Sequence, residues 1–227
     1  GEVLKGLKLN DKTKLLAIIA NKRGAQDAAH FEEINYLGYP FSVSEEFQKR
    51  NTNTTLEESL TVLEEIKAIA DKANKDLVVY LSMAFGNPYG EEWNPDNVIK
   101  WAERLHREFG IKTLALSDTI GTSSRGSIDR LFNGLIPALP RVNFGAHLHT
   151  TPDTWREKVD AAYQAGCRRF DGALKGFGGC PMAKDDLTGN MPTEKMLGYF
   201  EERGVETGVE QDKVNQALLA VADVFPL

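Results

Sequence analysis

The sequence has 227 residues, of which 41% are hydrophobic and 26% are charged, and its formal net charge is −6. This length suffices for one large domain with a substantial core, or for two small domains. The acidic balance argues against a nucleic-acid partner, because phosphate binding needs a concentrated basic face. No apolar run approaches the ~20 residues of a membrane span, and the first residues show no signal-peptide pattern. Two cysteines fit a reducing compartment, so we expect a cytoplasmic protein without a membrane partner.

Short β-rich runs alternate with amphipathic helical segments along the whole chain. The predicted strands are 15–20, 34–41, 77–83, 113–117, 142–149 and 169–173. The clearest helices are 56–73, which starts at a Thr55–Glu58 capping box, and 94–110 and 151–166, which open with Asn-Pro and Thr-Pro. This alternation predicts an α/β fold with a parallel sheet and helices outside it.

Two parallel architectures fit this pattern. A doubly wound nucleotide-binding sheet is disfavoured, because no G-x-G-x-x-G follows an early strand. A (β/α)8 TIM barrel is favoured, although it typically needs ~250 residues and only about six strand–helix units are visible. We therefore expect residues 1–227 to form a single, partial TIM-barrel domain.

His147 and His149 are the strongest candidate site residues. They sit two positions apart at the carboxyl end of the fifth predicted strand, so both imidazoles face the same side of the sheet. Barrel enzymes place their active sites at this end of the strands, and convergent imidazoles suit a divalent metal. The alternative is a pair of histidines that are simply hydrogen-bonded in a packed barrel mouth.

A glycine-rich loop, Lys175 to Pro181, follows the sixth predicted strand and contains Cys180. Its glycines allow close approach to a ligand, and a cysteine there is better placed as a reactive thiol than as a core residue. The alternative is an incidental exposed cysteine. Cys167, between a helix and a strand, is interpreted as a small buried apolar residue.

Three further polar residues stand near predicted element ends. Asn190 could ligate a hard cation or simply form a turn, and Glu194 could be an ordinary acid of a first helical turn. Asp118 ends the fourth strand, where we expect it to face the same mouth as the histidines. It could act on a substrate there or cap the following turn.

Together, five stretches resemble the 3-hydroxy-3-methylglutaryl-CoA lyases, within the metal-dependent TIM-barrel lyase superfamily. The matching stretches are Ser82 to Tyr89, Ser117 to Gly121, His147 to His149, Gly178 to Pro181, and Gly189-Asn190 with Thr193-Glu194. The Gly-Gly-Cys-Pro loop and its trailing Gly-Asn are the specific part, whereas H-x-H is shared across the superfamily.

The resemblance implies the residue roles. His147, His149 and Asn190 would bind a divalent metal, Mg²⁺ or Mn²⁺, and His147 would also act in proton transfer at the substrate hydroxyl. Cys180 would be the catalytic thiol, and Asp118 and Glu194 would support the acid–base network. The implied reaction is cleavage of an acyl-CoA substrate, hydroxymethylglutaryl-CoA, to acetyl-CoA and acetoacetate in leucine catabolism, and we expect a homodimer.

The sequence also departs from the family. An Arg-Asp pair on a first strand, with the Asp as metal ligand, is absent here, and Thr150 stands where the family has Asp. We therefore expect an open barrel with weak or no turnover by this chain alone. Two rival interpretations remain: a Claisen-type acyltransferase of the same superfamily, against which Cys180 argues, and a non-catalytic barrel remnant.

Overall fold

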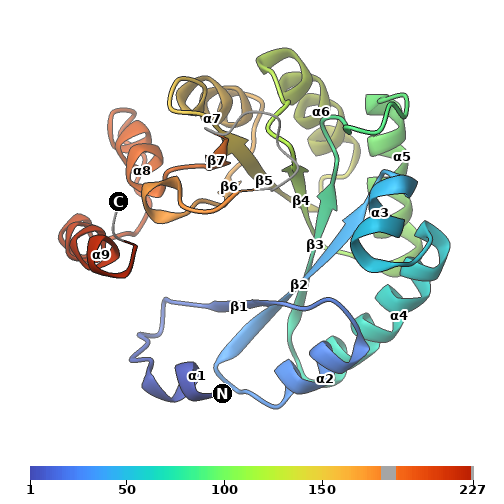
Figure 1. Cartoon of the computed structure of the whole chain (residues 1–227), viewed down its shortest axis with the longest axis horizontal. Helices are drawn as coiled ribbons and strands as arrows, with labels where there is room; N and C mark the ends of the chain where they lie inside the picture. Colours follow the sequence, from blue (N-terminus) through green and yellow to red (C-terminus); the bar gives the residue numbers. More distant parts are fainter. Residues whose placement is uncertain (180–187, 226–227) are drawn as a thin grey trace.

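A computed structural model describes residues 1–179 and 188–225 of the chain. Its centre is a curled sheet of parallel strands in sequence order, β1 to β6, with helices packed around the outside (Figure 1). The strands are β1 (Leu15–Ile18), β2 (Ile34–Ser42), β3 (Asp76–Ser82), β4 (Thr113–Asp118), β5 (Asn143–Thr150), β6 (Arg169–Phe170) and the antiparallel β7 (Gly189–Asn190). The expected α/β architecture with six parallel strands is confirmed.

The helices lie between the strands and after them. They are α1 (Glu2–Gly6), α2 (Lys22–Ala29), α3 (Glu45–Thr52), α4 (Leu56–Lys72), α5 (Pro95–Phe109), α6 (Arg125–Ala138), α7 (Trp155–Gln164), α8 (Thr193–Glu201) and α9 (Gln211–Val224), with a short 3-10 turn η1 at Leu174–Gly176. Among these elements, no helix is long and apolar enough to cross a membrane.

Local signals explain where the predicted helices begin and end. The capping box of α4 forms as expected, with Thr55 and Glu58 each bonding the other's backbone N–H. Asn94 caps α5, and Gly110 ends it at a φ of 67°. The third prediction was wrong at its start: α7 begins at Trp155, because Thr154 accepts the backbone N–H of Thr151 at 2.8 Å and closes a turn there.

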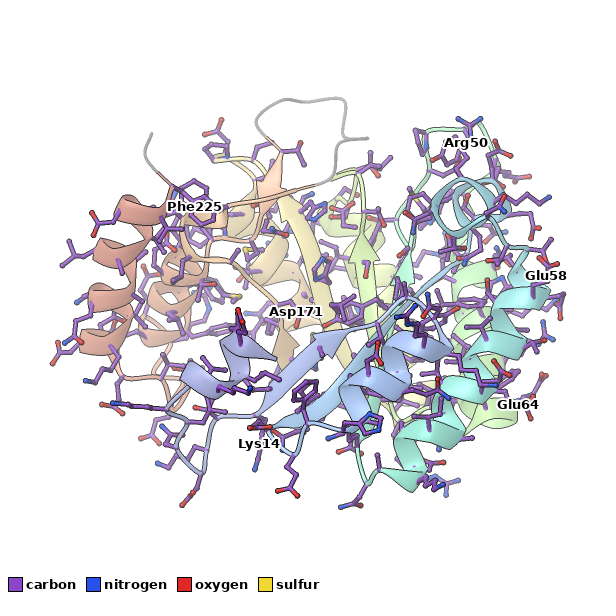
Figure 2. The ribbon with its side chains drawn as sticks, turned by 60° about the horizontal axis from the view of Figure 1, so that its bottom comes forward. Lys14, Arg50, Glu58, Glu64, Asp171 and Phe225 are labelled. Atoms are coloured by element: carbon purple, nitrogen blue, oxygen red, sulfur yellow. The ribbon has the colours of Figure 1, made fainter. Side chains whose placement is uncertain are left out.

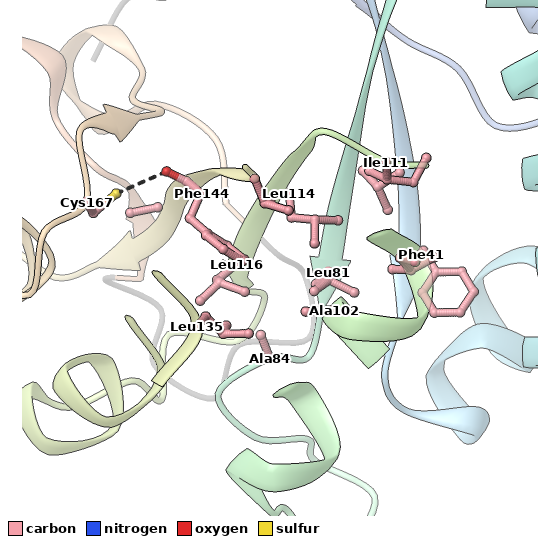
Figure 3. Packing of buried hydrophobic residues seen from close by; sticks show 14 of the residues in the cluster. Phe41, Leu81, Ala84, Ala102, Ile111, Leu114, Leu116, Leu135, Phe144 and Cys167 are labelled. Atoms are coloured by element: carbon pink, nitrogen blue, oxygen red, sulfur yellow. Dashed lines mark hydrogen bonds between the residues drawn. The ribbon is translucent and has the colours of Figure 1, made fainter. Parts of the chain in front are cut away.

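The hydrophobic core lies between the sheet and its helices (Figure 3). Alternate residues of β4 and β5 supply it, including the fully buried Leu114 and Leu116 and the nearly buried Phe144. Cys167 belongs to this core, as expected: it is 1% exposed and its thiol donates to the Phe144 carbonyl at 3.6 Å. Burial raises the pKa of Cys167 to about 12, so the thiol stays protonated and inert.

Strand β7 places a distant segment beside the end of β5. It pairs antiparallel with β5, so that His149 lies opposite Asn190 and Thr150 opposite Gly189. Within the described residues the parallel sheet does not close, since its order runs from β1 to β6 without a pairing between those two. The carboxyl ends of the strands form one mouth, and β7 lies over it next to β5 (Figure 1).

Candidate active site

His147 and His149 lie side by side in a cavity at the mouth of the sheet. The alternation of β5 sends both imidazoles inward, and their ring centroids are 5.6 Å apart. The cavity has a volume of about 610 Å³. Its polar lining comes from four strand ends: Tyr80, Ser82, Ser117, Thr119, His147, His149 and Asp171. The sequence therefore brings the two histidines together as expected.

Each imidazole is anchored through its Nδ1 atom. The His149 Nδ1 lies 2.9 Å from the carbonyl oxygen of Thr119, and the His147 Nδ1 lies 3.2 Å from Oδ2 of Asp171. Because a carbonyl and a carboxylate only accept, each Nδ1 carries the ring proton when the ring is neutral. The lone pair then sits on Nε2, which is the atom that a metal or a transferable proton requires.

The surroundings favour a neutral His149 and an ionised Asp171. Burial lowers the pKa of His149, and the neighbouring His147 lowers it further. The hydrogen bond to the Thr119 carbonyl acts in the opposite direction but does not outweigh burial. Burial alone would raise the pKa of Asp171, but the hydrogen bond from His147 and the charge of Arg169 outweigh it and hold that pKa below its usual range. The site thus combines an unprotonated imidazole nitrogen on His149 with a charged carboxylate on Asp171.

Asn190 reaches the same site from β7. It lies opposite His149 in the β5–β7 pairing, and its amide nitrogen donates to the Phe177 carbonyl at 2.7 Å. A Cβ at position 178 would lie 2.8 Å from that amide nitrogen, so the glycine there makes room for it. The structure therefore places Asn190 beside His149, with the glycine-rich segment packed against it.

Cys180 lies outside the described residues. The segment leading to it ends at Gly179, where an added Cβ would come 2.7 Å from the Thr188 carbonyl. Gly179 therefore lies close against the backbone of Thr188, the residue that precedes β7.

Asp118 does not face the mouth, which corrects the expectation from sequence. It is 1% exposed and bonds Lys158 at 2.8 Å, the Ser123 hydroxyl at 2.5 Å and the Ser123 backbone N–H at 3.0 Å. The reason is the pleat of β4: Ser117 and Thr119 point into the cavity, so Asp118 between them points toward α7. Its negative charge still acts on the site at a distance, where it works to raise the pKa of His149 against the effect of burial.

Glu194 lies at the base of the glycine-rich loop, away from the two imidazoles. Its carboxylate accepts the backbone N–H of Lys175 at 2.9 Å, and both residues line a separate small cavity of about 170 Å³ that Asn190 also borders. Thr150 donates to the Asn190 carbonyl at 3.3 Å. These contacts tie the backbones of Lys175 in the loop and Asn190 in β7 to the neighbouring elements.

Sequence reasoning missed Asp171, Arg169 and Tyr80. Arg169 and Asp171 are two positions apart at the end of β6, the same spacing as His147 and His149 on β5, and that spacing could have indicated a second inward-facing pair. Tyr80 stands on β3, where its edge meets the His147 ring with the centroids 5.4 Å apart.

The donor set suits a divalent cation in part. Two imidazoles with Nε2 lone pairs and a neighbouring amide are ligands that Mn²⁺ and Mg²⁺ sites use together with carboxylates. Across residues 1–179 and 188–225, however, no three His, Cys, Asp or Glu side chains converge as a complete metal cluster. The residues present fit a metal and leave coordination positions for other donors.

The comparisons with known proteins agree with this geometry. The HMGL-like family matches residues 6–221. A hydroxymethylglutaryl-CoA lyase of Bacillus subtilis is 33% identical over 216 residues, covering 95% of this chain and 71% of that protein. A crystal structure of a B. subtilis HMG-CoA lyase superposes with a TM-score of 0.90 at 32% identity, covering 98% of this chain and 74% of that one.

A second solved structure carries ligands. It is an HMG-CoA lyase from Acinetobacter baumannii in complex with coenzyme A and 3-methylmalate, with a TM-score of 0.86, 26% identity, and coverage of 98% of this chain and 72% of that one. Across curated relatives from B. subtilis, Danio rerio and human, this chain spans 58% to 71% of their length. The fold is that of the TIM-barrel lyases, and the chain belongs to the HMGL-like family.

Proposed function

We propose that this chain forms the greater part of a carbon–carbon lyase that cleaves 3-hydroxy-3-methylglutaryl-CoA into acetyl-CoA and acetoacetate. The observation that carries the proposal is the pair His147 and His149, both anchored at Nδ1 and both lining the mouth cavity beside Asn190. The relatives named HMG-CoA lyase support it, and so does the coenzyme A bound in the A. baumannii enzyme.

His147, His149 and Asn190 would hold a divalent cation, Mg²⁺ or Mn²⁺. Such a cation would supply positive charge that stabilises the negative charge developing on oxygen in the reaction. The anchors on Nδ1 are what prepare the rings for this task, because they fix both tautomers before any ligand arrives.

The protein's own groups would move two protons. The tertiary hydroxyl loses its proton near His147 as the carbon–carbon bond breaks, which yields the ketone of acetoacetate. The electron pair of that bond stays on the acetyl-CoA carbon, which then takes a proton from the Cys180 thiol. The role of Cys180 follows from the family resemblance, and the glycine-rich loop around it would exclude water from the carbanion.

The remaining predicted residues would act indirectly. Glu194 holds the Lys175 backbone at the start of the loop, and Asp118 holds Lys158 beneath β5. We further propose one partial barrel domain over residues 1–227, a homodimer, and a place in leucine catabolism in the cytoplasm. The relatives include proteins named cytoplasmic and mitochondrial, so the compartment needs its own localisation experiment.

Two measurements test the proposal. Calorimetric titration with Mn²⁺ should show binding that His147→Ala weakens strongly and that His30→Ala, a substitution in a remote histidine, leaves unchanged. Single-turnover assays with the protein in excess over hydroxymethylglutaryl-CoA should yield acetoacetate, slowly in view of the expected weak activity. Equal Mn²⁺ uptake by His147→Ala would refute the ligand assignment, and no acetoacetate from the parent would favour the non-catalytic alternative.

The acyltransferase rival predicts different results. If Cys180 is the proton donor, Cys180→Ala should lower turnover by orders of magnitude and leave Mn²⁺ affinity intact. Near-normal turnover of that variant, together with condensation of acetyl-CoA and a 2-oxoacid, would instead support the acyltransferase.

A further inference from the structure

A carboxylate, a guanidinium and a phenol form a connected cluster next to His147. Asp171 uses its two oxygens separately: Oδ2 lies 3.2 Å from Nδ1 of His147, and Oδ1 lies 3.2 Å from Nη2 of Arg169. The same guanidinium nitrogen donates to the Tyr80 hydroxyl at 3.4 Å. Asp171 therefore connects His147, which lines the cavity, to the guanidinium of Arg169.

Packing restrains this cluster, in addition to the hydrogen bonds within it. The Arg169 side chain crosses β5 over Gly145, where an added Cβ would lie 2.4 Å from Nη1 and 3.2 Å from Cδ. Nη1 is buried and has no hydrogen-bond partner among the residues that the structure describes. The guanidinium is thus confined to a slot that only glycine at position 145 leaves open, and Asp171 is held between it and the imidazole.

The backbone fixes Asp171 from the other side. Its N–H donates to the Ala146 carbonyl at 3.0 Å, directly beside His147 on β5. Figure 2 labels Asp171 among the side chains on the inner side of the strands, where it also lines the mouth cavity. Main chain and side chain together leave the carboxylate little freedom to turn away from the imidazole.

The two histidines differ in what anchors them. His149 bonds a main-chain carbonyl, which no substitution removes, whereas His147 depends on one side chain. We infer that Asp171 is a positioning residue: it accepts the Nδ1 proton of His147, fixes that tautomer and turns Nε2 into the cavity, while Arg169 holds the carboxylate in place. This inference deepens the proposed function, since an oriented Nε2 is what metal binding and proton transfer at His147 require.

The first test reads the tautomer directly and needs neither metal nor substrate. In protein with ¹⁵N-labelled histidine, the His147 signals, assigned with a His147→Gln variant, should report a proton on Nδ1. Asp171→Ala should shift them toward the other tautomer or a mixture. Asp171→Asn should keep the parent pattern, because the amide oxygen can still accept. An unchanged tautomer in Asp171→Ala would overturn the inference.

The second test measures Mn²⁺ affinity by calorimetry. Asp171→Ala should weaken binding by about 10- to 100-fold, and Asp171→Asn should weaken it less. Asp160→Ala is the matched control: Asp160 also pairs with an arginine at 2.9 Å and is 21% exposed against 22% for Asp171, but it stands on α7 and does not line the mouth cavity. It should lose stability with no change in Mn²⁺ affinity.

The outcomes separate the two levels of the proposal. Equal loss of Mn²⁺ affinity in both Asp→Ala variants would mean a merely structural role and would overturn the inference. If the parent binds Mn²⁺ and shows the Nδ1 tautomer but yields no acetoacetate, the proposed reaction fails while the positioning role stands. If Asp171→Ala does not fold, the parent protein decides: a neutral His147 ring that carries its proton on Nε2 in the parent would overturn the inference.

Discussion

Lys158 and Asp118 form an ion pair of 2.8 Å in which the two side chains are only 5% and 1% exposed. The Lys158 ammonium also donates to the carbonyls of His149 at 2.8 Å and Gly121 at 3.0 Å. All three of its protons therefore have acceptors, as a buried charge requires. Through this pair, a helix on the outside of the sheet holds the backbone of a residue whose side chain faces the cavity.

Removing one member of this pair should be costly. Lys158→Met leaves Asp118 buried without its countercharge, and we expect a loss of about 3–5 kcal/mol in the free energy of unfolding, measured by urea denaturation. Lys67→Met is the control, because Lys67 pairs with the exposed Asp71 on the surface and should lose no more than about 1 kcal/mol. Similar losses in both variants would contradict the buried role of Lys158.

The inert thiol of Cys167 can be tested by chemical labelling. In a Cys180→Ser background it is the remaining cysteine, and burial raises its pKa from 9.0 to about 12. Labelling by a maleimide near pH ~8 should be negligible in the folded protein and rapid in urea, since the thiolate is the reactive form. Rapid labelling without urea would show that the Cys167 thiol is accessible in the folded protein and would contradict its burial.

The same shift gives a dependence of stability on pH. A group whose pKa is higher in the folded than in the unfolded state contributes stability that is fully present below the unfolded value and is lost as pH rises. The contribution of Cys167 should therefore decline between about pH 9 and about pH 12. Urea midpoints of the parent should fall more steeply over this range than those of Cys167→Ala.

Gly189 is predicted to tolerate no side chain. A Cβ there would lie 2.7 Å from the Gly176 carbonyl and 3.2 Å from that of Gly178, so Gly189→Ala must push β7 away from the glycine-rich segment. We expect a loss of about 1–3 kcal/mol by urea denaturation and weaker Mn²⁺ binding. In the helix α8, a new Cβ at Gly198 would have no atom of the other described residues outside its own helix backbone within 4 Å, so Gly198→Ala should instead be neutral or stabilising.

The cap of α5 offers a test of local structure. Asn94 accepts the backbone N–H of Asp96 at 2.8 Å, and Asn94→Ala should cost about 1 kcal/mol in the free energy of unfolding. Asn97→Ala makes the same exchange at an exposed position inside the helix, where alanine is the better residue, and should not destabilise the protein. Equal effects would mean that the cap contributes nothing measurable.

Much of the scaffold could be predicted because its signals are local. The strands and the helices α4 and α5 follow from periodicity and caps that a few neighbouring residues define, and their bounds agree with prediction within a few positions. α7 starts later than predicted, because Thr151 and Thr154 bond each other and that turn outweighs the Pro signal. Five helices were not predicted: α1, α2, α3, α6 and α9. The first three have only five to eight residues each, which is too short for an apolar stripe to repeat.

The site was predictable only in part. His147 and His149 share one strand, so period two sufficed to place both in one cavity. Asp118 was misplaced although the same rule applies, because its neighbours Ser117 and Thr119 are the residues that face inward. The hydrogen bond that His147 donates to Asp171 joins two neighbouring strands and depends on the sheet register. That register places Ala146 opposite Phe170 and cannot be read from either strand alone.

The antiparallel pairing of β7 with β5 has a consequence for affinity. Asn190 and His149, 41 positions apart in the chain, face each other through main-chain pairing, so their separation is set by sheet geometry. The entropy lost in bringing the two side chains together is lost when the protein folds. A ligand that contacts both side chains would therefore meet a pair whose spacing is already fixed. Selectivity among cations of different radius would then reflect the stiffness of a two-residue ribbon.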